Sequence, residues 1–312
     1  MIDFIKHFLL VIATFCSACS VQHLSNTTIS AEPTEVLLKH LYYLSSDNLQ
    51  GRRVGTKGNE LARKYIVNHL EKHNIKPLGS RYLSAFTISS PFKLKQGNNV
   101  VGFIEGTEFP DKFLVLSAHF DHIGARGRNI YNGADDNASG TSALLDYAKR
   151  LQQAPLRHSV ILLFTDGEET NLKGAKAFIA QNPSLLASIV LNINLDMIGG
   201  SKTTKKLHYV SRRLEQVLSA EKILSLEQQN YAIVFKKGFR QSINGRKKNI
   251  RWELASDHGV FYRQKIPFIY YGVGLHRNYH QSTDTYQNIN HRFFMSAVAL
   301  IFHQISFIDE NL

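Results

Sequence analysis

Histidine and acidic side chains recur in this sequence directly after short apolar runs. Imidazole nitrogens and carboxylate oxygens are donors with which proteins bind zinc and other divalent metal ions. The runs and the polar residues that follow them are 113–116 with His119 and Asp121, 160–164 with Glu168 and Glu169, 189–195 with Asp196, and 267–271 with His280. This repeated pattern predicts a metal-binding site that the four segments build together.

A further acidic pair, Asp135 and Asp136, lies between the first two of these runs. The segment 133–140 reads Gly-Ala-Asp-Asp-Asn-Ala-Ser-Gly, and a helical pattern begins at Thr141. Histidines and carboxylates brought together at strand ends would carry a buried excess of negative charge, which a cation would offset. This charge favours metal ligation over a purely structural role for the set.

The apolar runs are expected to be strands of one sheet. Short apolar runs rich in β-branched residues are typical of strands covered on both faces, and open α/β sheets place ligands at the carboxyl ends of such strands. Helices are expected over 33–44, 57–73, 141–151, 171–181 and 291–308, and strands at the sheet edge over 82–90 and 99–104. We therefore predict an α/β fold, a three-layer α/β/α sandwich with a mixed, mostly parallel central sheet.

The order of the motifs resembles the M28 family of co-catalytic zinc aminopeptidases. The matching motifs are His119-Phe120-Asp121, the segment 133–140, Gly167-Glu168-Glu169, Leu195-Asp196-Met197, Ser256-Asp257-His258, and Tyr279-His280 through Asp284. The resemblance runs from about Glu32 to the C-terminus and includes each position at which the family carries a metal ligand. It implies the zinc exopeptidase fold and a hydrolase that removes amino acids from the free N-terminus of peptides.

The resemblance also implies the metal ligands. Asp136 would bridge two zinc ions, His119 and Asp196 would complete the coordination of one ion, and Glu169 and His280 that of the other. The same nitrogen and oxygen donors accept other divalent metals, so the native metal stays open.

Catalytic roles are implied in the same way. Glu168 would be the general base, Asp121 would accept the second ring N–H of His119, and Tyr279 would help to hold the oxyanion. For Tyr279, a buried structural role is the alternative. A non-proline cis peptide bond is implied between Asp136 and Asn137.

Several residues beside the motifs have less specific interpretations. Asp257 and Asp284 are expected to support the site, and His122 is expected to lie either beside a metal ligand, without binding the metal, or at the surface. Arg52 and its neighbour Arg53 are interpreted as structural.

Two other enzyme activities and one binding function remain open as alternatives. The same fold hosts glutaminyl cyclase-like acyltransferases with a single zinc, and it hosts carboxypeptidases. A non-enzymatic binding module of the kind found in receptor ectodomains is a third possibility. The complete ligand series and Glu168 argue against the cyclase and the binding module.

The N-terminal residues indicate export. Residues 1–20 combine Lys6, an apolar run and small residues, which is typical of a signal peptide or lipoprotein leader. Cys19 resembles a bacterial lipoprotein acylation site, although Cys16 stands where an aliphatic residue is usual; ordinary cleavage that discards both cysteines is the alternative. We expect a tether over 21–31, one peptidase domain over 32–312, and a periplasmic protein, an outer-membrane lipoprotein or a secreted protein.

A basic segment covers residues 201–251. It holds 13 Lys or Arg against 3 Glu, a net charge of +10 out of +12 for the chain. A solvated basic face with loops and an edge hairpin is one interpretation, and attraction to an anionic membrane surface or to acidic peptides is the other. No nucleic-acid motif accompanies the charge, so no nucleic-acid partner is expected. The oligomeric state stays open.

Overall fold

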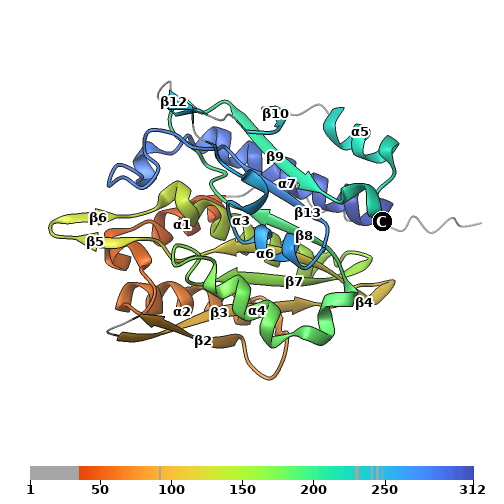
Figure 1. Ribbon diagram of the computed structural model, residues 1–312, viewed down its shortest axis with the longest axis horizontal. Coiled ribbons are helices and arrows are strands. Elements are labelled where there is room, and N and C mark those ends of the chain that lie inside the picture. Colours follow the sequence, from red (N-terminus) through yellow and green to blue (C-terminus); the bar gives the residue numbers. More distant parts are fainter. Residues whose placement is uncertain (1–34, 91–92, 229–231, 240–241, 244–245, 248) are drawn as a thin grey trace, which may run out of the picture.

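A mixed sheet of nine strands forms the centre of the computed structural model, which describes residues 35–90, 93–228, 232–239, 242–243, 246–247 and 249–312. The strands follow the order β1-β3-β7-β4-β8-β13-β9-β10, and β2 pairs with β3 (Figure 1). Their bounds are β1 Lys76–Pro77, β2 Leu83–Ser90, β3 Lys93–Ile104, β4 Phe109–His119, β7 His158–Thr165, β8 Ile189–Leu195, β9 Lys206–Arg212, β10 Val234–Lys237 and β13 Phe268–Gly272. The predicted mixed α/β sheet is confirmed.

The four central strands, β7, β4, β8 and β13, run parallel to one another, whereas β3 and β9 join them antiparallel. Every residue of β7 is buried, as expected for an apolar strand covered on both faces. In the register of the sheet His119 lies beside Thr165, and Leu195 lies beside Tyr271. The four strands therefore end at one edge, where the side chains that follow them converge.

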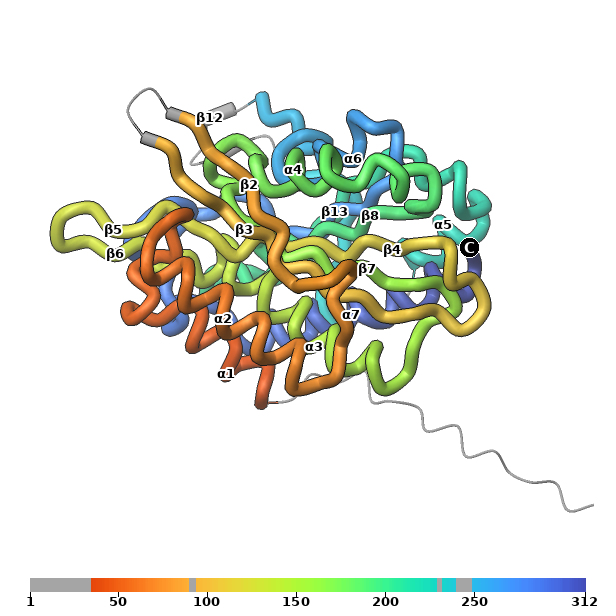
Figure 2. The backbone as a smooth tube through the Cα atoms, turned by 90° about the horizontal axis from the view of Figure 1, so that it is seen from below, coloured from red at the N-terminus to blue at the C-terminus, as the bar shows by residue number. Residues whose placement is uncertain are grey.

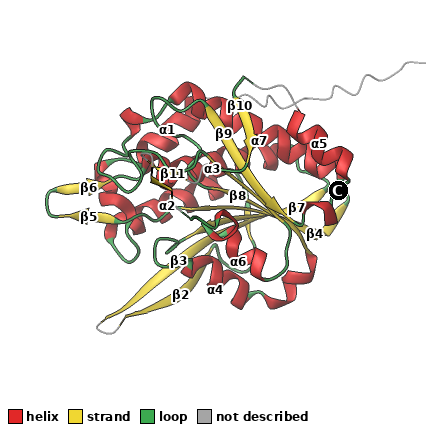
Figure 3. Cartoon of the chain, turned by 45° about the horizontal axis from the view of Figure 1, so that its top comes forward, coloured by secondary structure: helices red, strands yellow, loops and turns green. Residues whose placement is uncertain are grey.

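Helices cover both faces of this sheet, which confirms the predicted three layers (Figure 3). One core contains residues from the sheet and from helices α1 Glu35–Leu44, α2 Lys57–Lys72, α3 Gly140–Gln153, α5 Ala220–Gln228 and α7 His291–Asn311. The second core, on the opposite face, involves α4 Lys173–Gln181 and α6 His258–Arg263. Figure 2, seen from below, shows α1 and α2 along one side of the sheet and α4 and α6 along the other.

Some element boundaries differ from those expected. α4 begins at Lys173 rather than near 171, because Asn171 and Leu172 have φ values of 66° and 57°, which a helix does not contain. The strand expected over 99–104 at the sheet edge is the end of a longer strand, β3, and most of it lies inside the sheet between β1 and β7. The first half of β3 pairs with β2 on one side and has no partner strand among the described residues on the other side, so that side is an edge of the sheet.

The C-terminal helix α7 is long and apolar enough to cross a membrane by length and composition alone. In this structure 61% of its most apolar window is buried, and it packs into the larger core. Asp309, near its end, accepts hydrogen bonds from the backbone N–H groups of Arg157 and His158. These contacts fix α7 to the start of β7, so it is a core helix of the domain.

Three histidines, His40 of α1, His69 of α2 and His73 directly after α2, form a row of ring contacts. His40 stacks edge-on against His69, which contacts His73, and the His40 Nδ1 atom lies 2.7 Å from the hydroxyl of Tyr65. Burial, together with the charges of these histidines and of two nearby lysines, lowers the pKa of His40 to about 3. The lysines are Lys72 of α2 and Lys149 of α3.

The basic segment 201–251 contributes β9, α5, β10 and a small hairpin of β11 Ser242–Ile243 and β12 Arg246–Lys247. A hairpin was expected at the sheet edge; the one observed forms a separate two-stranded sheet, and α5 was not expected. The predicted leader 1–20 with Cys16 and Cys19, and the predicted tether 21–31, lie outside the described residues.

Candidate metal centre

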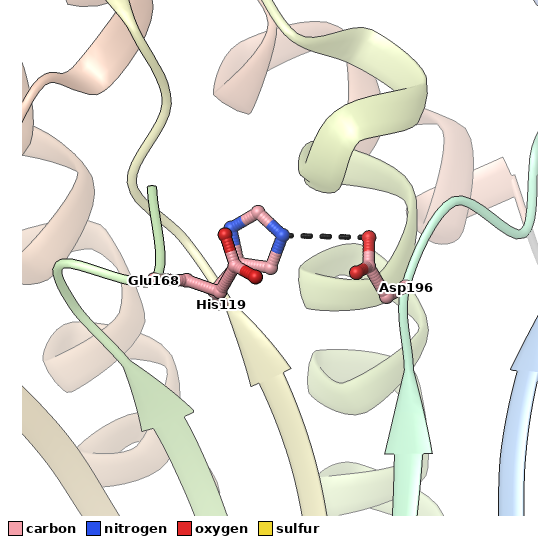
Figure 4. Close-up of side chains that lie close together, drawn as sticks. All are labelled: His119, Glu168 and Asp196. Atoms are coloured by element: carbon pink, nitrogen blue, oxygen red, sulfur yellow. Dashed lines mark hydrogen bonds and ion pairs between the residues drawn. The ribbon is translucent and has the colours of Figure 1, made fainter. Parts of the chain in front are cut away.

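The first group of donor atoms lies where β4, β7 and β8 end. His119 is the last residue of β4 and Asp196 directly follows β8, and His119 Nε2 lies 3.4 Å from Asp196 Oδ1. Glu168 reaches both residues from the loop after β7 (Figure 4). One donor atom from each of the three side chains lies within 4.8 Å of the other two.

The second group of donor atoms contains Asp136, Glu169 and His280. His280 Nε2 lies 3.1 Å from Asp136 Oδ2 and 3.2 Å from Glu169 Oε1. The other oxygen of Asp136, Oδ1, lies 3.4 Å from His119 Nε2 in the first group. Asp136 therefore presents one carboxylate oxygen to each group, which is the placement required of a bridging ligand.

These side chains have the arrangement of ligands that share a cation. Glu169 Oε1 is buried and close to His280 Nε2, yet within the described residues it accepts no hydrogen bond. Buried polar atoms normally have hydrogen-bond partners. Ligands of one ion lie close together while their lone pairs point at the ion rather than at one another. The five residues expected as ligands thus converge in two groups that fit divalent cations.

The loop that carries Asp136 is held by the carboxylate of Asp284. Its two oxygens accept hydrogen bonds from the backbone N–H groups of Asp135, at 2.9 Å, and Asp136, at 3.1 Å. The peptide bond between Asp136 and Asn137 is cis, as the family resemblance implied. Asp284 thus makes direct contacts that hold the loop carrying Asp136.

Asp121 contacts the site differently from the expectation. The His119 Nδ1 atom lies 3.2 Å from the backbone carbonyl oxygen of Asp121 and 3.7 Å from its carboxylate. The nearer acceptor for this ring nitrogen is therefore the backbone carbonyl. The carboxylate of Asp121 instead accepts the backbone N–H of Glu168 at 3.0 Å. Asp121 thereby links the His119 strand to the loop that carries Glu168.

The buried side chain of Arg52 holds two loops of the site together. Its side chain is 1% exposed, and its guanidinium donates to the carbonyls of Phe120 at 2.7 Å and Gly133 at 2.9 Å. It also donates to the carbonyls of Leu44 and Asn132. Burial lowers the pKa of Arg52 to about 10, still above neutral pH. Arg52 therefore keeps its positive charge close to the acidic cluster. Its contacts with backbone carbonyls agree with the structural role expected for it.

Two carboxylates near the ligands make contacts that no sequence pattern specifies. Asp135 accepts the backbone N–H groups of Gly199 and Gly200, both at 2.7 Å, and lies 2.8 Å from His276 Nε2. Asp257 accepts a hydrogen bond from the hydroxyl of Thr165, the last residue of β7. Asp135 thus ties the loop beyond Asp196 to the loop before His280.

Of the two positions expected for His122, beside a ligand or at the surface, the structure shows the first. The residue is 1% exposed, so it does not lie at the surface, and its Nδ1 atom is 2.8 Å from Glu169 Oε1. One donor atom from each of His122, Asp136 and Glu169 lies within 4.8 Å of the other two. Its spacing of three residues from His119 was visible in the sequence, but no strand periodicity continues past the end of β4 to orient it.

The electrostatics of the site reflect crowded carboxylates. Burial and the acidic neighbours Asp196 and Asp257 raise the pKa of Glu168 well above its ordinary value. Burial opposes the charge on His119, but Asp196 and Glu168 outweigh it and raise the pKa of His119. Burial, followed by the charge of Asp136, raises the pKa of Tyr279. A dication between the groups would relieve this excess of negative charge.

A cavity of about 310 Å³ opens beside the two groups. One wall consists of Asp136, Glu168, Asp196 and His280, and Tyr279 stacks on the ring of His280 with centroids 3.9 Å apart. The remaining lining residues are mostly apolar: Met197, Ile250, Trp252, Ala255, Tyr270 and Leu275. Tyr279 therefore lies at the site, as expected, and the cavity offers donor atoms on one side and apolar surface on the other.

Comparison with known families and curated proteins places the chain among peptidases. The family model described as Peptidase family M28 matches residues 99–304. A glutamate carboxypeptidase 2 homolog of Caenorhabditis briggsae is 32% identical over 122 residues, which are 36% of this chain and 15% of that protein. A probable zinc metalloprotease of Leptosphaeria maculans is 24% identical over 193 residues, which are 58% of this chain and 43% of that protein. The matched region thus spans less than half the length of either relative.

Solved structures share the fold. A glutaminyl cyclase of Macrostomum lignano superposes with a TM-score of 0.70 at 20% identity and covers 90% of this chain and 91% of its own. A Zn-dependent exopeptidase of Parabacteroides distasonis gives 0.65 at 18% identity, with 87% and 97% covered. An aminopeptidase of Aneurinibacillus sp. strain AM-1 gives 0.65 at 12% identity, with 88% and 93% covered. At these identities the likeness concerns the fold alone.

Proposed function

Because this chain belongs to peptidase family M28, whose model matches residues 99–304, we propose that it is a zinc-dependent aminopeptidase. It would hydrolyse peptides at the free N-terminus and release single amino acids. The observation that supports this most directly is the cavity, in which the side chains proposed as ligands face an apolar wall. Such a cavity accommodates the N-terminal residue of a peptide with its amino group on the acidic side.

The proposed ligands follow from the two groups of donors. Asp136 would bridge two ions, His119 and Asp196 would complete the first, and Glu169 and His280 the second. Two zinc ions held there would polarise the attacking water and the scissile carbonyl and would stabilise the developing negative charge.

Glu168 is the residue of this chain that would move the proton. It lies with His119 and Asp196, whereas its neighbour Glu169 lies with Asp136, so the adjacent carboxylates face different groups. A carboxylate outside the ligand set can take the proton of the attacking water and return it to the leaving amine. Tyr279, which lines the same cavity, would donate to the carbonyl oxygen as it becomes negative.

The charges around the cavity favour an aminopeptidase over a carboxypeptidase. Among the described residues that line the cavity there is no Lys or Arg. Among these described lining residues a terminal carboxylate would find no Lys or Arg, whereas a terminal ammonium would be attracted by several carboxylates. The glutaminyl cyclase alternative has the support of the shared fold. The two groups of donors, which provide for two ions, favour the aminopeptidase over it.

A comparison of one peptide in two forms tests the proposal. The peptide is digested with a free N-terminus and with an acetylated N-terminus, and the products are followed by mass spectrometry. We expect stepwise loss of N-terminal residues from the free form and protection of the acetylated form. Equal cleavage of both forms would favour an endopeptidase or a carboxypeptidase, and cyclisation of an N-terminal glutamine without shortening would favour the cyclase.

We also propose that the protein is exported, on the composition of residues 1–20. Acylation of Cys19, and attraction of the basic segment 201–251 to anionic lipid, would hold it at a membrane. Fatty-acid labelling of the native protein and of Cys19→Ser distinguishes an anchored form from a released one. Recovery of uncleaved protein from the cytoplasm would contradict export.

A further inference from the structure

We propose that His122 is a metal ligand, and that it supplies a fourth protein donor to the ion held by Asp136, Glu169 and His280. This inference rests on the proposed metal centre, but it does not depend on which end of a peptide the enzyme attacks. It makes the two ion positions unequal, one with three protein donors and one with four.

Backbone packing fixes the position of the His122 ring. The residue lies three positions after the end of β4, and its ring rests against Gly133 on the loop that carries Asp136. A Cβ atom added at Gly133 would lie 2.6 Å from the Cγ and Cδ2 atoms of the ring. The glycine therefore gives the imidazole room to reach the second group of donors.

The ring nitrogen of His122 is close to a ligand atom but poorly aligned for a hydrogen bond to it. Nδ1 lies 2.8 Å from Glu169 Oε1, a distance typical of a strong hydrogen bond. Within the described residues, however, neither atom has a hydrogen-bond partner, so the two atoms are near and misaligned. His280 Nε2 lies beside the same oxygen at 3.2 Å, also without a hydrogen bond between them. Close approach without alignment is expected where atoms direct their lone pairs at a common third point.

Both histidines lie within 4 Å of the same two carboxylates. For tetrahedral zinc with bonds of about 2.0–2.1 Å, neighbouring ligand atoms are about 3.3 Å apart. The separations are 2.8 Å and 3.9 Å from His122 Nδ1 to Glu169 and Asp136, and 3.1 Å and 3.2 Å from His280 Nε2 to Asp136 and Glu169. These four values lie on both sides of the ideal distance. The donor atoms of His122, Asp136 and Glu169 already lie within 4.8 Å of one another, and coordination by all four residues would bring the rings of His122 and His280, whose centroids are 5.7 Å apart, toward a common point.

The two ion positions would then differ in chemistry. Zinc sites with four protein donors are typically structural, whereas catalytic sites keep a position open. With His122 the Glu169 position has four protein donors, while the His119 position has Asp136, Asp196 and His119, with Glu168 beside it. The Glu169 position should therefore fill first and retain its ion longer, and the His119 position should keep its open site for substrate.

X-ray absorption spectroscopy at the zinc edge tests this inference, because it counts imidazole ligands per zinc. The purified full chain is made metal-free and loaded with one equivalent of zinc. We expect two imidazoles per zinc, from His122 and His280, and one imidazole in His122→Asn. One imidazole per zinc in the native protein would overturn the inference.

Zinc affinity provides the second measurement. Loss of a residue that only hydrogen-bonds to a metal ligand lowers metal affinity roughly 10- to 100-fold. If His122 is itself a ligand, His122→Asn should lower the affinity for the first equivalent of zinc by more than about 100-fold. His158→Asn is the matched control, since His158 is also buried but pairs with Asp309 at the start of β7. It should bind zinc like the native protein.

The outcomes separate this inference from the proposed function. An unchanged imidazole count in His122→Asn, with a loss of affinity below 100-fold, would make His122 an outer partner of Glu169 and overturn the inference. A native protein that binds no zinc would overturn the proposed metal centre as well. Hydrolysis of free but not acetylated peptides by a protein with one imidazole per zinc would overturn the His122 ligand alone.

Discussion

Replacing Arg52 by Lys should destabilise the domain and weaken its metal centre together. The guanidinium donates to four backbone carbonyls, among them those of Phe120 and Gly133. A lysine ammonium has three donors in place of five and cannot match the planar arrangement, so at least one carbonyl loses its partner. A hydrogen bond to a charged group contributes about 1.5–3 kcal/mol, and a buried carbonyl left unsatisfied costs a similar amount.

We therefore expect Arg52→Lys to lower the free energy of unfolding of the metal-free protein by about 2–4 kcal/mol. Zinc affinity should fall as well, because Phe120 lies between His119 and Asp121 and Gly133 lies three residues before Asp136. The measurements are urea denaturation followed by circular dichroism and a zinc titration of the folded variant.

The neighbouring Arg53 provides the control, because its side chain is exposed. Arg53→Lys should change the free energy of unfolding by no more than about 0.5 kcal/mol, as surface substitutions generally do. If Arg52→Lys and Arg53→Lys unfold at the same urea concentration with the same zinc affinity, the role given to the buried guanidinium is wrong.

Three further outcomes are expected. Glu168→Gln should keep the fold and the bound zinc while turnover falls roughly 100- to 10,000-fold, and turnover within twofold of native would remove Glu168 as the base. Asp136→Ala should lose more zinc than His119→Ala by elemental analysis, since Asp136 faces both groups of donors, and equal residual zinc would exclude a bridge. His40→Gln should reduce the loss of folding stability at acidic pH. The pKa of His40 is lowered to about 3 in the folded protein, against an ordinary 6.5. As the pH falls below 6.5, the His40 side chain therefore takes up a proton only in the unfolded chain, which favours unfolding. From pH 7 to 5 the metal-free native protein should therefore lose about 2 kcal/mol more stability than the variant, and equal losses in urea denaturation would contradict this.

The sequence was most informative where periodicity and strand ends coincide. The apolar runs before His119, Glu168 and Asp196 form parallel strands, and the register of the sheet aligns their carboxyl ends. Convergence of the side chains that follow is a consequence of that topology, so it could be predicted without coordinates. The helix expected over 57–73 is α2, and Thr56 directly before it accepts the N–H of Asn59 and caps it.

Predictions were weaker where the chain leaves regular structure. The orientation of His122 depends on the turn after β4 and on contact with Gly133, which is distant along the sequence. The carboxylate of Asp121 contacts the Glu168 N–H because two loops meet there, and no local pattern records that meeting. Helix α5 lies in a segment whose charge dominates its composition, and only Leu226 among its residues is buried. Its apolar periodicity is correspondingly faint.

A zinc titration that follows both metal content and peptide hydrolysis tests the proposed function most directly. Metal-free protein is given increasing zinc while release of the N-terminal amino acid from one unblocked peptide is measured, and bound zinc is determined by elemental analysis of the same samples. We predict little hydrolysis without metal, full hydrolysis when two zinc ions are bound per chain, and loss of activity again on addition of a strong chelator. Full hydrolysis by protein shown to be free of metal would contradict the proposed zinc-dependent mechanism.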